Sequence, residues 1–113
     1  MIKIYHNIRC KKSRAGLLHL KGKTDNFEII EYLKTGITEE ELKQLFKILD
    51  EKPEEMIRKQ EKIYKEIYKN KTFSDEEWIK ILAENPKLLN RPIVVKGKKA
   101  VWGDPAANID TLF

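Results

Sequence analysis

The chain has 113 residues, of which 41% are hydrophobic and 36% charged, so it is long enough and apolar enough to form one compact domain over residues 1–113. The 23 Lys and Arg residues outnumber the 18 Asp and Glu residues to give a net charge of +5, but they alternate along helical segments, which indicates solvated helix faces rather than a nucleic-acid surface. The single cysteine excludes an internal disulfide and a cysteine-rich zinc site, and the lack of a signal peptide or long apolar run predicts a cytoplasmic protein without membrane contact.

The beginning of the chain predicts a strand, a helix and a second strand. Residues 2–6 alternate apolar and polar side chains, which is typical of a strand, and residues 27–33 predict the second strand. Between them we expect a helix that begins at Ser13 and ends at Gly22. The predicted apolar face of this helix consists of Ala15, Leu17, Leu18 and Leu20. The helix would cross over between parallel strands in the right-handed sense.

The middle of the chain, residues 38–86, is expected to be a helical insert. Capping boxes that begin at Thr38 and Ser74 mark the starts of helices, and Pro53 suits the first turn of another. Apolar and aromatic pairs at helical spacing over residues 63–68 predict one more helix. The buried stripe of the first helix is expected to consist of Leu42, Leu45, Phe46 and Leu49.

After the insert, the sequence returns to strands. Residues 92–95 and 100–102 predict a hairpin with its turn at Gly97-Lys98. A last helix is expected to begin at Pro105, with Ile109, Leu112 and Phe113 on its buried side. This order of elements predicts an α/β fold of the thioredoxin-like type, a mixed sheet of about four strands with a helical insertion.

Cys10 is the candidate nucleophile. It lies in the turn before the first helix, where unpaired amides and the helix dipole favour an anion. Cationic side chains and a helix start both favour the thiolate, which predicts a reactive thiol rather than an inert core cysteine. The cations beside it in the sequence are Arg9, Lys11, Lys12 and Arg14.

Three neighbours of Cys10 are candidate supporting residues. Ser13 stands where a dithiol oxidoreductase carries its second cysteine, and its hydroxyl either donates to the thiolate or caps the helix. His6 either shuttles protons or only makes a structural hydrogen bond, and Asn7 is expected to fix the turn. A phosphatase-type loop would need an arginine at position 16, which is Gly16, and we expect no metal site because no clustered His, Asp and Glu pattern is present.

Motifs along nearly the whole chain resemble one family. They are Tyr5-His6-Asn7, Cys10-Lys11-Lys12-Ser13-Arg14, Arg58-Lys59 and Asn90-Arg91-Pro92-Ile93-Val94-Val95. Together they resemble the glutaredoxin-coupled arsenate reductases, which have a thioredoxin-like fold and are related to Spx-type regulators. The resemblance implies that Cys10 attacks arsenate, that glutathione resolves the adduct as co-substrate, and that glutaredoxin completes the reduction to arsenite. It implies no bound cofactor.

The resemblance also implies roles for particular residues. Arg58 and Arg91 are expected to bind the oxyanion with bidentate guanidinium donors, which offset its repulsion from the thiolate. Pro92 is expected to follow a cis peptide bond and to face the cysteine. Supporting roles are implied for His6, Asn7, Ser13 and Arg14.

Two positions depart from the family pattern. Ile8 stands where proline is usual, and Asp104 stands where many relatives carry a third oxyanion-binding arginine. At about 4 Å and an effective dielectric near 20, each unit of charge is worth about 4 kcal/mol before screening, so an inward carboxylate would weaken anion binding. We expect weak or absent arsenate reduction with Cys10 still reactive toward glutathione, and faster turnover in Asp104→Arg. Lys98, Lys99 or Arg14 are the candidate compensating cations.

Two alternatives to an arsenate reductase remain open at this point. One is an Spx-like regulator that binds RNA polymerase, although Ser13 removes the second cysteine of the usual redox switch. The other is a monothiol protein that becomes glutathionylated at Cys10 and has no role with arsenate. For the chain itself we expect a monomer.

Overall fold

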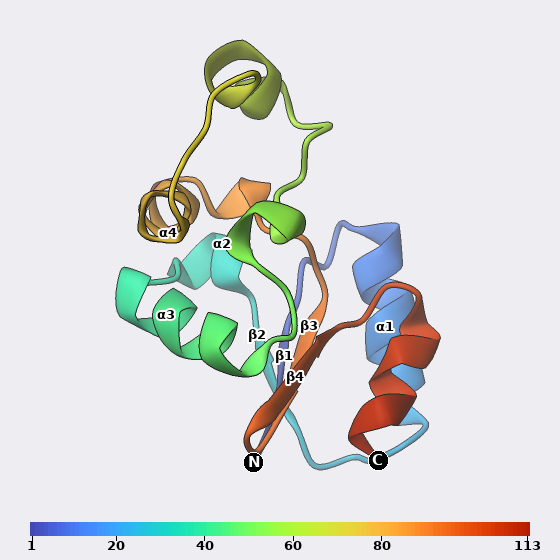
Figure 1. Cartoon of the computed structure of the whole chain (residues 1–113). Coiled ribbons are helices and arrows are strands. Elements are labelled where there is room, and N and C mark those ends of the chain that lie inside the picture. The colour runs from blue at the N-terminus through green and yellow to red at the C-terminus, as the bar shows by residue number, and fades with distance from the viewer.

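A mixed four-stranded sheet forms the centre of the computed structural model, which describes residues 1–113 (Figure 1). The strands are β1 (Ile2–Tyr5), β2 (Glu28–Ile30), β3 (Ile93–Lys96) and β4 (Lys99–Trp102). Their order is β2-β1-β3-β4, with β1 parallel to β2 and every other pair antiparallel. The predicted α/β class and mixed sheet of about four strands are therefore confirmed.

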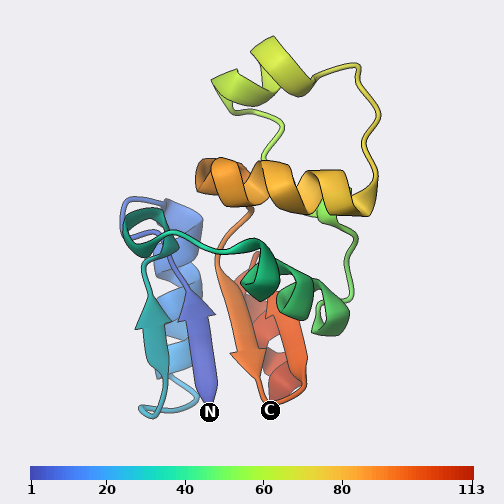
Figure 2. The ribbon, with the colours of Figure 1, turned by 90° about the vertical axis from the view of Figure 1, so that its left-hand side faces the viewer.

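One face of the sheet is covered by the first and last helical segments. These are α1 (Lys11–Lys21) and the 3-10 helix η4 (Ala106–Leu112), which lie side by side in both ribbon views (Figure 2). Their small core consists of Ile4, Leu20, Val94, Ile109 and Leu112. This layer is the one that carries Cys10 at its edge.

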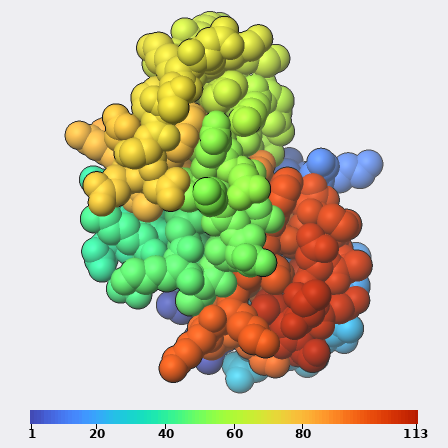
Figure 3. Space-filling view, viewed as in Figure 1, coloured from blue at the N-terminus to red at the C-terminus, as the bar shows by residue number.

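The opposite face is covered by the helical insert, which spans residues 32–88 instead of the predicted 38–86 and builds the larger core of the molecule. Its α-helices are α2 (Tyr32–Thr35), α3 (Glu39–Ile48) and α4 (Asp75–Glu84). Its shorter segments are the 3-10 helices η1 (Pro53–Met56) and η3 (Pro86–Leu88) and the π-helical turn η2 (Tyr64–Tyr68). Both predicted capping boxes are present, and the η2 region forms a lobe at one end of the molecule (Figure 3).

The second strand is shorter than predicted. We expected a strand over residues 27–33, but β2 ends at Ile30 and Tyr32 begins α2. The reason is the length of its partner, because β1 ends at Tyr5, which pairs with Ile30. The chain beyond this point has no strand to pair with and turns into the insert.

Helix α1 begins earlier than predicted and buries a different face. It starts at Lys11, with Cys10 as its N-cap, and its buried residues are Ser13, Gly16 and Leu20. Ala15 and Leu18, which were predicted to face the core, are exposed. Small residues occupy the buried positions because this helix packs closely against the loop that precedes β3.

The end of the chain and the lobe also differ from expectation. Phe113 was predicted to be buried but is 48% exposed, with the Lys96 ammonium 4.3 Å from its ring centre. Pro105 precedes η4 as its N-cap instead of lying inside the helix. Where one more helix was predicted over residues 63–68, the π-helical turn η2 covers Tyr64–Tyr68 and buries none of its residues fully. None of the helices has the length and apolar character needed to cross a bilayer.

Candidate active site

Cys10 lies at the point where the β1–α1 loop becomes helix α1. Its backbone is extended, its amide donates to the Asn7 carbonyl at 3.0 Å, and its carbonyl accepts from the Arg14 amide at 2.9 Å. The thiol is partly exposed. It therefore caps a helix N-terminus, where amides without a helical partner are available to a negative sulfur.

The environment of Cys10 favours the thiolate. Burial raises the pKa of the thiol, but the backbone amides of Ser13 and Lys12 and the guanidinium of Arg91 outweigh burial, so the pKa is lowered from its ordinary value of 9.0. The four cations next to Cys10 in the sequence were expected to produce this effect, but their side chains are all exposed. Arg91, which is distant in the sequence, is the cation that acts on the sulfur.

Ser13 organises the loop that holds Cys10. Its fully buried hydroxyl accepts a hydrogen bond from the Asn7 amide at 3.0 Å and forms a second hydrogen bond, of 2.6 Å, with His6 Nδ1. It makes no cap to helix α1, and neither role expected for the hydroxyl is the one seen. Burial lowers the pKa of His6, which favours the neutral imidazole.

The rest of the loop is held by short-range hydrogen bonds. Asn7 fixes the turn as expected, because its side-chain oxygen accepts from the Arg9 amide at 3.1 Å. The Arg14 guanidinium donates to the Ile8 carbonyl at 3.0 Å. Arg14 therefore braces the loop at the position where Ile8 replaces the usual proline.

The Pro92 loop packs against α1 beside Cys10. The Arg91–Pro92 peptide bond is cis, as expected, and the Asp104–Pro105 bond is cis as well. A Cβ atom on Gly16 would lie 2.5 Å from Pro92 Cγ, so only glycine fits at this approach. The Pro92 carbonyl accepts from the Gly103 amide at 2.8 Å, which ties together the loops on either side of the β3–β4 hairpin.

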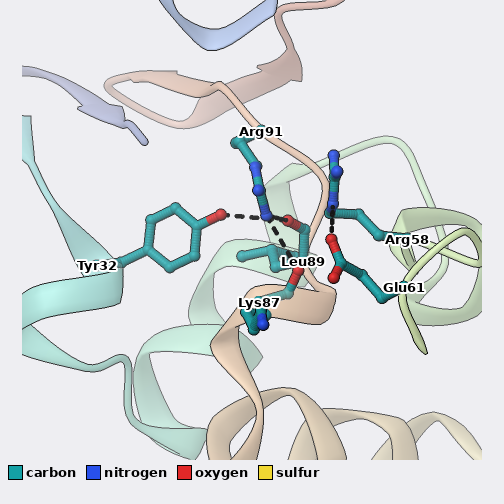
Figure 4. Close-up of polar contacts among 6 residues, drawn as sticks. All are labelled: Tyr32, Arg58, Glu61, Lys87, Leu89 and Arg91. Carbon is teal, nitrogen blue, oxygen red and sulfur yellow. Dashed lines mark hydrogen bonds and ion pairs between the residues drawn. The ribbon is translucent and has the colours of Figure 1, made fainter. Parts of the chain in front are cut away.

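Arg91 is held by backbone carbonyls and has no carboxylate partner (Figure 4). Its Nη1 donates to the Lys87 carbonyl at 3.0 Å and to the Leu89 carbonyl at 3.4 Å. The residue is only 7% exposed, and its buried Nε has no hydrogen-bond partner. A buried arginine with unused donors and no neutralising anion is suited to receive an anionic ligand.

Arg58, the other predicted oxyanion ligand, is partly neutralised. Its Nε donates to Glu61 at 3.0 Å, and its side chain is 17% exposed. Figure 4 shows its terminal nitrogens pointing away from Glu61, which leaves them free to bind a ligand. Arg58 and Arg91 both lie near enough to Tyr32 to affect the pKa of its phenol.

Tyr32 was not predicted to belong to the site. Its side chain is fully buried, and its hydroxyl donates to the Leu89 carbonyl at 3.2 Å. Burial is the main reason that its pKa is raised to about 12, and a charged Cys10 adds to this increase. No sequence pattern marks Tyr32 as a site residue, because its partner Leu89 lies in a distant segment.

Asp104 lies next to Lys12 at the edge of the site. The Lys12 Nζ is 3.2 Å from its carboxylate, and the Asp104 side chain is 24% exposed. The candidate compensating cations Lys98, Lys99 and Arg14 do not form this pair. Lys98 and Lys99 lie at the hairpin turn, where β4 begins, whereas Asp104 follows its other end.

Comparisons with known proteins point to one group of proteins. The sequence model described as the ArsC family matches residues 5–112. The chain is 37% identical to an arsenate reductase of Neisseria meningitidis serogroup B, over 99% of this chain and 97% of that protein. It is 40% identical to the uncharacterized protein YfgD of Escherichia coli, over 96% of this chain and 92% of that protein. The solved structure of an arsenate reductase from Vibrio cholerae matches it with a TM-score of 0.92 at 36% identity, over 99% of this chain and 97% of that one.

Proposed function

Since the chain belongs to the ArsC family, we propose that it is a glutathione- and glutaredoxin-dependent reductase that attacks arsenate with the Cys10 thiolate. Membership of this family makes the chain a thiol oxidoreductase of the arsenate reductase type. The proposal adds the nucleophile, the oxyanion ligands and the electron donors. The observation that carries it is the Arg91 guanidinium beside a thiol at a helix N-terminus, which lowers the pKa of that thiol.

The proposed reaction begins with the sulfur of Cys10. The thiolate forms a bond to arsenic, and one arsenate oxygen leaves as water after protonation. Two electrons then reduce As(V) to As(III), one from the thiol of glutathione and one from a glutaredoxin thiol, which end as a mixed disulfide. The arsenic oxygen lost in this reduction leaves as water, and hydrolysis of the sulfur–As(III) bond by a water molecule then releases arsenite and restores the Cys10 thiolate. The protein itself therefore needs only one cysteine.

The arginines supply the electrostatics of this step. A tetrahedral oxyanion that approaches a thiolate brings two negative centres together, so buried guanidinium donors are needed to offset the repulsion. Arg91 is held by two backbone carbonyls and has no carboxylate partner, and Arg58 offers its terminal nitrogens beyond its contact with Glu61. These are the two oxyanion ligands in the proposal.

Asp104 is proposed to make arsenate reduction weak. It removes the third arginine of many relatives and also binds the ammonium of Lys12, which is next to the helix N-terminus. The pair offsets the negative charge of Asp104 but adds no donor to the site. Reactivity of Cys10 toward glutathione disulfide needs no oxyanion ligand, so we expect it to be retained.

The deciding experiment measures arsenite formation from arsenate in the presence of glutathione and glutaredoxin. We expect slow turnover that is lost in Cys10→Ser, and rapid glutathionylation of the wild-type thiol by glutathione disulfide. Glutathionylation without any Cys10-dependent arsenite would leave a thiol protein without an arsenate role and would reject the proposed substrate. Alkylation of Cys10 no faster than that of an unfolded peptide thiol would reject the nucleophile itself.

A further inference from the structure

The carbonyl of Leu89 accepts hydrogen bonds from two buried side chains in the site. Tyr32 donates its hydroxyl proton to this oxygen at 3.2 Å, and Arg91 donates from Nη1 at 3.4 Å (Figure 4). Arg91 makes a shorter bond to the Lys87 carbonyl, at 3.0 Å. Tyr32 and Arg91 thus meet at one acceptor, although they come from opposite ends of the insert.

We propose that Tyr32 is a positioning residue, which sets the location of the Arg91 guanidinium relative to Cys10 by sharing the Leu89 carbonyl. The inference rests on the proposed role of Cys10 as nucleophile. A carbonyl oxygen that already accepts a phenol proton is a weaker acceptor for a second donor, and this matches the longer Arg91 bond to Leu89. Without the phenol, the guanidinium is expected to move toward the Leu89 oxygen and away from the sulfur.

The protonation state of Tyr32 fits this role. Burial raises the pKa of its phenol to about 12, so the hydroxyl keeps its proton at physiological pH. A neutral phenol donates to the carbonyl and does not attract the guanidinium as a phenolate would. Arg91 therefore has no anionic partner in Tyr32, and its buried Nε makes no hydrogen bond within the chain.

Packing alone is the competing explanation for Tyr32. Its ring lies in the larger core and meets the ring of Tyr5 edge to face, with centroids 6.5 Å apart. Tyr5 is also buried, but it makes no side-chain hydrogen bond to residues 87–92, the segment that carries Arg91 and its two carbonyl acceptors. The two tyrosines therefore form a matched pair. Replacing either one by phenylalanine preserves the aromatic packing, but only Tyr32→Phe removes a hydroxyl that shares an acceptor with Arg91.

The test compares the pH dependence of Cys10 alkylation by iodoacetamide in Tyr32→Phe, Tyr5→Phe and wild type. The single cysteine makes this readout specific. We expect Tyr32→Phe to raise the thiol pKa, which slows alkylation about threefold to tenfold below that pKa, and Tyr5→Phe to leave it unchanged. In an Arg91→Ala background, Tyr32→Phe should have no further effect, since the residue that it positions is gone.

Every outcome separates this inference from the proposed function. Equal thiol pKa values in wild type and Tyr32→Phe would overturn the inference, whether or not thermal stability falls. An effect of Tyr32→Phe that persists in the Arg91→Ala background would overturn it as well. A raised thiol pKa that needs Arg91 supports it even if wild-type protein fails to reduce arsenate, in which case only the proposed substrate is lost.

Discussion

In the thiol half of the candidate site, residues 6–14, the side-chain hydrogen bonds that shape the loop join residues no more than seven positions apart. The other half, called the arginine half, consists of Tyr32, Arg58, Glu61 and residues 87–92, and its bond from Tyr32 to the Leu89 carbonyl joins residues 57 positions apart. The thiol half depends on the start of one helix, whereas the arginine half forms only when the whole insert packs against the sheet. The loop around Cys10 is thus formed by neighbours in the sequence, whereas the cation that acts on its thiol, Arg91, comes from a distant segment.

The two halves also differ in how strongly their cations act. Arg9, Lys11, Lys12 and Arg14 are close to Cys10 in the sequence, but their charges are exposed and screened by water. Arg91 is 7% exposed and acts through a medium of lower dielectric. One buried arginine therefore lowers the pKa of the thiol more than the exposed cations beside it. Burial, rather than the number of nearby charges, decides which cations matter.

Removal of Arg91 is expected to have the largest effect, and it tests whether the buried cation matters more to the site than the exposed ones. Arg91→Ala should lower arsenate turnover by about a hundredfold to a thousandfold, as expected for loss of a buried oxyanion donor. The same change should raise the pKa of Cys10 toward its ordinary value of 9.0. Arg9→Ala removes an exposed guanidinium from the thiol half and serves as the control. Similar losses from both substitutions, measured by turnover and alkylation rate, would contradict the distinction between the halves.

The same distinction explains what the sequence could predict. The order of strands and helices along the chain, the capping boxes at Thr38 and Ser74, and the position of Cys10 just before the first helix follow from periodicity and capping within short segments, and they were predicted. Tyr32 was missed because its role depends on the Leu89 carbonyl, and backbone positions in a distant loop leave no pattern in the sequence. Arg58 and Arg91 were found only through the resemblance to a family, since neither stands in a pattern of its own.

The contact between Gly16 and Pro92 joins helix α1, which follows the thiol half, to the arginine half. Gly16→Ala would place a methyl group 2.5 Å from Pro92 Cγ and 3.3 Å from the Gly103 carbonyl, so the Pro92 loop must move. We expect a loss of about 1–3 kcal/mol in the free energy of unfolding, measured by urea denaturation. Gly22→Ala, at the C-cap of the same helix, is the control, because its Cβ would meet only the His19 carbonyl, at 3.3 Å. Equal free energies of unfolding for both variants would show that the Pro92 loop can move without loss of stability.

The pair of Asp104 and Lys12 tests whether an exposed charge in the thiol half can strengthen arsenate binding once its partner is removed. Asp104→Asn frees the Lys12 ammonium and should lower the KM for arsenate up to about fivefold, the range of a partly exposed ion pair. Asp104→Arg should raise turnover further, because it adds a guanidinium donor. The control is Asp110→Asn on η4, which removes a carboxylate paired with Lys23 and should leave the kinetics unchanged. Arsenate kinetics that are flat across all three variants would show that Asp104 has no electrostatic effect on the site.

Glu61 tests the arginine half with the smallest expected effect. Glu61→Gln keeps an oxygen that can accept from the Arg58 Nε but removes the negative charge that partly neutralises this arginine. The geometry of Arg58 should be preserved and its attraction for an anion increased. We therefore expect the KM for arsenate to fall about twofold to threefold with little change in kcat, the scale of a weak ion pair.

Glu61→Ala separates charge from position at the same residue, because it removes the acceptor as well. If Glu61 mainly holds Arg58 in place, Glu61→Ala should raise KM while Glu61→Gln does not. The control for both is Glu66→Gln, which removes a carboxylate paired only with the exposed Lys62 at 3.7 Å. An increase in KM in Glu61→Gln would mean that Arg58 needs the carboxylate charge to stay in the site. The position of Arg58 would then depend on a charged partner within the insert, whereas Arg91 is held by neutral carbonyls.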